Sequence, residues 1–247
     1  MGYSLFSKWL SDKKGGAIFT CFGGWHFVWI ISTVLVALLI VFLIKNKAQD
    51  YKNSATKTII NIAFGLYIAD FFLMPFAYGE IDVEKLPFHI CTVMCVMSFW
   101  SRHCDKLKPY TGIFARLGLI SNLIYVIYPA GVGWYSIHPL SYRVWQTLLY
   151  HGLMTTYGLL VLLYEPPKKG WRRDALVCVC MVLWALLGNT LYNNTTRLYN
   201  WSFVVRDPFY LLPGELARFV MPVVMLLILL GLDMLLYAIS KRRFSNK

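Results

Sequence analysis

The sequence predicts an all-α protein: a polytopic membrane helix bundle with seven transmembrane helices. Of its 247 residues, 58% are hydrophobic and only 15% are charged, and the mean hydropathy is +0.55. A soluble domain carries about 25% charged residues. The apolar residues form long runs, and most lysines and arginines stand in the loops between them. Most of the chain is therefore expected to lie within a bilayer.

Seven apolar runs approach the roughly 20 residues that a helix needs to cross the hydrocarbon core. They are 25–44, 57–78, 86–100, 111–129, 142–164, 172–192 and 214–239. The third run is short, and Pro87 is expected in its first turn, where a missing N–H costs least. A re-entrant or interfacial segment is the alternative for this run.

The loop charges predict the orientation, because lysine and arginine favour the cytoplasmic side. The cation-rich segments are 45–56, 101–110, 165–173 and 241–247, whereas the loops that alternate with them carry few cations or none. The N-terminus is therefore expected outside and the C-terminus in the cytoplasm. The predicted parts are an extracytoplasmic or interfacial segment at 1–24, a transmembrane domain at 25–240 and a basic tail at 241–247.

The net charge of +12 is accounted for by these topology-determining loops, so no nucleic-acid partner is expected. The six cysteines show no paired zinc-ligand spacing, and neither disulfides, a metal nor a cofactor is expected. No obligate protein partner is evident. The expected location is the plasma membrane of a bacterium, or the endoplasmic reticulum or Golgi membrane of a eukaryote.

Polar residues at membrane depth are costly and are therefore candidates for function. In the predicted topology they gather in the outer half of the bilayer. They are His26, Asp70, His89, Cys91, His151, Asn189 and Asn193, with Arg218 near the outer end of the last span. His151 would lie about nine residues into its span, roughly 13 Å deep. We interpret the group as one site.

Several short motifs carry these residues. They are His26-Phe27, Leu86-Pro87-Phe88-His89-Ile90-Cys91, Leu149-Tyr150-His151-Gly152-Leu153, Asn189-Thr190-Leu191-Tyr192-Asn193 and Asp207-Pro208-Phe209-Tyr210. In kind, order and spacing they resemble the YwaF-type integral membrane proteins of bacteria and their animal relative, transmembrane protein 164.

The resemblance implies a membrane-embedded acyltransferase or transacylase that acts on phospholipids and lysophospholipids. The animal relative transfers a polyunsaturated acyl chain to a lyso-ether phospholipid through a cysteine. That cysteine directly precedes the motif histidine, where this chain has Phe88, whereas Cys91 follows His89 by two residues. The nucleophile therefore cannot be carried over directly.

Three readings of the motif remain open. Cys91 could be the nucleophile, with His151 or His89 as its base. Thr92 could be the nucleophile, because it shares a helix face with His89. Cys91 could instead be a small buried side chain without a covalent role.

The other candidates also have structural alternatives. His151 could simply bond Asn122 or Tyr125 on a neighbouring helix. Asp70 could orient a histidine or link two helices. Asn189 and Asn193 could hold a lipid carbonyl or headgroup, or join helices. His26 could bind substrate or snorkel to the interface. Arg218 could meet a phosphate or pair with Glu215.

Two further functions are consistent with the sequence. One is an intramembrane lipid hydrolase with a three-histidine zinc site, which His26, His89 and His151 could form. Zinc enzymes of the alkaline ceramidase and adiponectin receptor type carry a His-x-x-x-His pair in the last span. This chain departs from that pattern, because no histidine follows His151. The chain could also be a non-enzymatic lipid-binding or transport protein.

Overall fold

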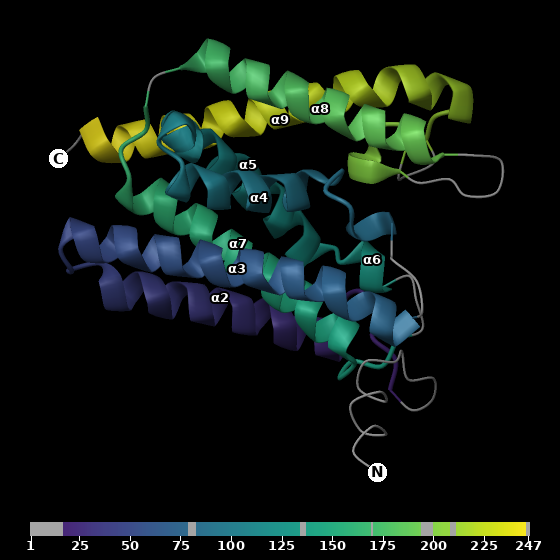
Figure 1. The fold of residues 1–247 in the computed structure, drawn as a ribbon, viewed down its shortest axis with the longest axis horizontal. Coiled ribbons are helices and arrows are strands. Elements are labelled where there is room, and N and C mark those ends of the chain that lie inside the picture. The colour runs from purple at the N-terminus through teal and green to yellow at the C-terminus, as the bar shows by residue number, and fades with distance from the viewer. Residues whose placement is uncertain are drawn as a thin grey trace. The chain divides into compact units, whose positions relative to one another are not determined.

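The computed structural model describes residues 17–78, 83–133, 137–168, 170–193, 200–207 and 211–245. Within these ranges every regular element is a helix and there is no strand, which confirms the predicted all-α class (Figure 1). The longer helices are α2 (Gly24–Ile44), α3 (Gln49–Tyr78), α4 (Ile90–His103), α5 (Thr111–Ile127), α7 (Tyr142–Tyr164), α8 (Trp171–Tyr192) and α9 (Gly214–Ser245). The shorter ones are η1 (Val83–Lys85), η2 (Asp105–Tyr110), α6 (Ala130–Gly133) and η3 (Trp201–Phe203).

Six helical segments of the described chain are long and apolar enough to cross a membrane: Gly24–Ile44, Gln49–Leu73, Asp105–Ile127, Tyr142–Tyr164, Trp171–Tyr192 and Gly214–Ser245. They correspond to six of the seven predicted spans. The third predicted span is α4, which has 14 residues and is therefore about 21 Å long, against a hydrocarbon core of about 30 Å. The count of seven and the orientation of the termini remain predictions.

The chain forms two compact units. The first consists of residues up to 82 together with 119–164, and the second of 83–118 together with 165–247. Helix α5 contributes its first half to the second unit and its second half to the first. Each unit is built from segments that lie far apart in the sequence.

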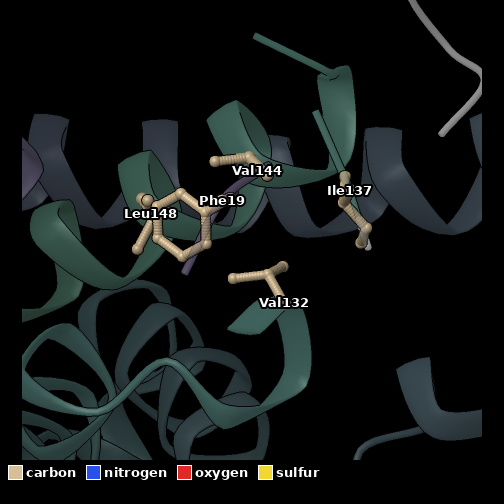
Figure 2. Close-up of a cluster of buried hydrophobic side chains, with 5 residues drawn as sticks. All are labelled: Phe19, Val132, Ile137, Val144 and Leu148. Atoms are coloured by element: carbon tan, nitrogen blue, oxygen red, sulfur yellow. The ribbon is translucent and has the colours of Figure 1, made fainter. Parts of the chain in front are cut away.

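In the first unit, α3 and α2 both pack against α7 (Figure 1). A buried apolar cluster joins the segment before α2 to α6 and α7, and Figure 2 shows its side chains: Phe19, Val132, Ile137, Val144 and Leu148. The backbone supports this cluster, since the Phe19 N–H donates to the Ile137 carbonyl over 2.8 Å. The start of α2 is thereby fixed to the start of α7.

Helix α2 approaches α7 closely at Gly152. A Cβ atom at this position would lie 3.2 Å from Oγ1 of Thr33 on α2, so the glycine permits the crossing. At the other end of the helix pair, the Tyr164 hydroxyl donates to the Val41 carbonyl over 3.0 Å.

In the second unit, α8 packs along α9, and η3 lies against both of them. Helix α4 packs against η2, which leads into the first half of α5. The entry to α4 corrects one prediction: the helix begins at Ile90, so Pro87 lies before the helix and not in its first turn. Contacts from α8 and η3, described next, hold residues 87–89 outside the helix.

Candidate functional site

The Leu86–Cys91 motif forms a turn that leads into α4 within the second unit, and its last two residues belong to the helix. His89 is the N-cap of the helix, with φ −75° and ψ 141°. Cys91 and Thr92 follow in the first turn, where the backbone N–H groups have no partner within the helix. The motif therefore places a thiol and a hydroxyl at the end of a helix that stabilises negative charge.

Side chains of α8 and η3 hold the backbone of the motif. The Trp184 indole donates to the Pro87 carbonyl over 2.6 Å. The Ser202 hydroxyl accepts the Ile90 N–H over 2.9 Å and donates to the Phe88 carbonyl over 3.4 Å. The peptide groups on both sides of His89 are thereby fixed by one serine.

Phe88 is a packing residue. Its ring lies 5.4 Å from that of Trp184, 5.7 Å from that of Tyr192 and 5.2 Å from that of Trp201, measured between centroids. It fills the space over Gly188, where a Cβ atom would come within 2.4 Å of the ring. The position that carries the cysteine in the animal relative is here an anchor of the motif on α8.

The hydroxyl of Thr92 bonds the backbone and not the imidazole of His89. Its Oγ1 donates to the His89 carbonyl over 2.9 Å. The imidazole of His89 instead accepts, at Nδ1, the backbone N–H of Ser202 over 3.3 Å. The Thr92–His89 side-chain pair that the shared helix face suggested is therefore not formed here.

His151 lies in α7 of the first unit, and one of the alternatives considered for it is present. Its Nδ1 lies 2.6 Å from Oδ1 of Asn122 on α5, and its ring stacks on Tyr125 with 3.8 Å between centroids. An amide oxygen can only accept, so Nδ1 carries the proton and the Nε2 atom carries the lone pair. A histidine held in this tautomer by an amide is suited to act as a base, as in Cys-His-Asn triads.

His26, in the same unit, has a structural role. It is fully buried, its Nδ1 accepts the Phe22 N–H over 2.8 Å, and its Nε2 lies 2.9 Å from the Val126 carbonyl. Since a carbonyl can only accept, Nε2 is the protonated nitrogen. Both ring nitrogens are thus engaged by the backbone, which argues against metal ligation by His26.

Asp70 is buried in α3 and forms a side-chain hydrogen bond with Tyr142 at the start of α7. This contact links two helices of the first unit, which is the structural alternative named for Asp70. Its other predicted role, that of orienting a histidine, stays a prediction.

Asn189 holds a loop in the second unit. Its Oδ1 accepts the Trp201 N–H over 3.1 Å, and its Nδ2 donates to the carbonyls of Ala185 at 2.7 Å and Trp201 at 3.3 Å. Asn193 ends α8, where its N–H donates to the Asn189 carbonyl. Asn189 is therefore connected to His89 through η3, a relationship that the sequence did not reveal.

Arg218 pairs with Glu215 at 3.8 Å, and the side chains are 62% and 86% exposed. This is the ion pair considered as an alternative to phosphate binding. Of the Asp207–Tyr210 motif only Asp207 is described, and residues 208–210 lie outside the described ranges.

Sequence reasoning missed a buried ionic network in the second unit. Arg116 on α5 bonds Asp174 on α8 at 2.8 Å and Asp233 on α9 at 2.6 Å, and all three residues are at most 5% exposed. Arg173 adds a contact to Asp174 at 3.2 Å. The sequence contained a signal for this network, because ionisable residues inside apolar runs are functional candidates by default.

A metal centre finds no support in the part of the chain that the structure describes. Within it, no group of three or more His, Cys, Asp or Glu side chains could hold a metal ion. The proposed three-histidine zinc site also requires His26, whose two ring nitrogens bond Phe22 and Val126.

The helices and their composition define a multi-pass α-helical membrane protein. The chain belongs to the TMEM164 family, whose model matches residues 21–237. This range includes every site residue discussed above and agrees with the resemblance found in the sequence motifs. No curated protein and no solved structure matches the chain.

Proposed function

We propose that this protein is a membrane-embedded acyltransferase or transacylase that acts on phospholipid acyl chains through Cys91. The observation that carries the proposal is the position of Cys91 in the first turn of α4, at the end of a motif whose backbone is fixed by Trp184 and Ser202. A nucleophile must be held in one geometry to react efficiently. Membership of the TMEM164 family and the motif resemblance support the same chemistry.

The proposed reaction has two halves. In the first, a general base takes the proton of the Cys91 thiol, and the sulfur attacks the ester carbonyl carbon of a phospholipid. The ester C–O bond breaks, the lysophospholipid oxygen takes the proton from the base, and an acyl-cysteine thioester remains. In the second, the hydroxyl of an acceptor lysophospholipid gives its proton to the base and attacks the thioester, the C–S bond breaks, and the base returns the proton to the Cys91 thiolate.

Among the predicted catalytic residues, His151 has the tautomer that a base needs, because Asn122 holds its Nδ1–H and thereby leaves the Nε2 lone pair as the basic position. A neutral imidazole is the commonest general base in such reactions. The substrates fit the predicted location of the motif in the outer half of the membrane, where phospholipids are the abundant esters. If the host is a bacterium, the membrane is the plasma membrane.

The test is intact-protein mass spectrometry after incubation with mixed phospholipids and lysophospholipids. We expect wild type to gain the mass of one acyl chain, and hydroxylamine to remove it. Cys91→Ser should lack the increment. Cys95→Ser is the matched control, because Cys95 lies one turn further along α4 and is fully buried.

Two results would contradict the proposal. An increment that persists in Cys91→Ser, or lipid turnover that survives this substitution, excludes the Cys91 thioester. Lipid that copurifies with wild type without any acyl product or adduct favours the binding or transport function.

A further inference from the structure

We propose that Ser202 is a positioning residue that fixes the tautomer of His89, so that His89 acts as a hydrogen-bond donor to the reacting carbonyl oxygen and not as a base. The donor role rests on the proposed acyl-transfer function. The tautomer assignment rests on geometry alone.

The first step concerns the ring of His89. Its Nδ1 faces the backbone N–H of Ser202 at 3.3 Å. A backbone N–H can only donate, so Nδ1 must offer its lone pair, and a neutral imidazole then carries its proton on Nε2. This is the opposite tautomer to that of His151, whose Nδ1–H is donated to Asn122. The two histidines therefore present different groups at Nε2, a proton on His89 and a lone pair on His151.

The second step concerns how firmly Ser202 is held. Its hydroxyl bonds the peptide groups that flank His89, at Ile90 N and Phe88 O. Asn189 bonds both the N–H and the carbonyl of Trp201, the residue before Ser202. The His89 imidazole and Ser202 thus belong to one hydrogen-bonded group, and rotation of the imidazole ring would break the bond at Nδ1.

The third step concerns the backbone of Ser202. Its φ is 56° and ψ 22°, which is the left-handed region that costs a non-glycine residue roughly 1–2 kcal/mol. Phe203 has φ 56° as well. Residues held in such conformations persist only where the surrounding contacts over-determine them. The bonds that Ser202 makes with Phe88, His89 and Ile90 are contacts of this kind.

The final step concerns chemistry. A thiolate attack on an ester develops negative charge on the carbonyl oxygen, and donors aimed at that oxygen give large rate effects. His89 is the N-cap residue of the helix that carries Cys91 in its first turn. Donor and nucleophile are therefore separated by a single residue, Ile90. A base at His89 would instead need its lone pair on Nε2.

The first experiment reads the tautomer without requiring activity. Protein labelled with ¹⁵N-histidine, in detergent or nanodiscs, should show an Nε2–H signal, separate from the one expected of His26, that disappears in His89→Gln. Ser202→Gly keeps the N–H and accepts a positive φ, so the Nε2–H tautomer should persist. Ser202→Val disfavours that φ and should give mixed tautomers. An Nδ1–H or doubly protonated His89 in wild type overturns the assignment, as does an unchanged tautomer in Ser202→Val.

The second experiment tests the donor role by the rate of acyl-adduct formation. The amide of His89→Gln can replace an Nε2–H donor, so its rate should stay within about tenfold of wild type, whereas His89→Ala should lose about 10²–10³-fold. His151→Gln cannot replace a base and should lose about 10²–10⁴-fold. Equal losses in His89→Gln and His89→Ala would overturn the donor role. If wild type forms no adduct, the proposed function and the donor role both fail, and the spectra still decide whether Ser202 fixes the tautomer.

Discussion

Replacing Arg116 by methionine should destabilise the second unit strongly. Methionine keeps much of the side-chain length and removes the charge. Asp233 then loses guanidinium bonds at 2.6 and 3.4 Å, and Asp174 loses one at 2.8 Å but keeps its contact with Arg173. Removing one partner of a buried ion pair costs about 3–5 kcal/mol. The uncompensated charge would be mainly that of Asp233.

At roughly 2–4 °C per kcal/mol for a chain of this size, the melting temperature should fall by about 10 °C. The assay is thermal unfolding of purified protein in detergent, followed by loss of the monodisperse peak in size-exclusion chromatography. Arg218→Met is the matched control, because its ion pair is exposed and such pairs contribute less than about 1 kcal/mol.

Adding Asp233→Asn to Arg116→Met should recover a substantial part of the loss, since the stranded charge is removed. A loss no larger than that of Arg218→Met would refute the view that the network stabilises the unit. No recovery in the double variant would refute the assignment of the penalty to Asp233.

Three further predictions follow from local geometry. Gly188→Ala should lower stability by about 1–3 kcal/mol and slow acylation, because its Cβ would lie 2.4 Å from the Phe88 ring; Gly231→Ala, with nothing within 4 Å, should be neutral or stabilising in the same melting assay. His26→Leu should lower the melting temperature, because it strands a backbone donor and acceptor at about 1–3 kcal/mol each; an unchanged melting temperature would contradict the structural role. Burial raises the pKa of the Cys21 thiol, so less thiolate is present at a given pH, and its alkylation by iodoacetamide, followed by peptide mass spectrometry, should require a higher pH than that of a free thiol.

The helical class and six of the spans could be predicted because hydropathy and loop charge act over 20-residue windows. The mean hydropathy of such a window changes little when four apolar residues are added or removed at its end. The start of α4 at Ile90 could therefore not be predicted. The non-helical form of residues 87–89 depends on Trp184 and Ser202, which lie about a hundred positions further along the chain.

The candidate site was predictable at the level of residues but not of partners. Asn122 was named as a possible partner of His151, because both were expected at membrane depth. Ser202 had no comparable signal, since a serine in a left-handed turn looks like any loop serine. Arg116, Asp174 and Asp233 were within reach of the same rule that singled out the histidines, and only their pairing needed the structure.

The uneven packing of the first unit bears on how the protein is made. Helix α2 has a mean hydropathy of 3.1 and is 11% buried, so it can enter the bilayer and remain there alone; α7 has a mean hydropathy of 1.3 and is 72% buried. Helix α7 leaves the ribosome after α2 and α3, the two helices against which it packs. Helix α7, which combines low hydropathy with a large buried share, is thus synthesised when α2 and α3 are already in the membrane. The His151–Asn122 bond can form only at that late stage, so the proposed base is assembled by the same event that completes the unit.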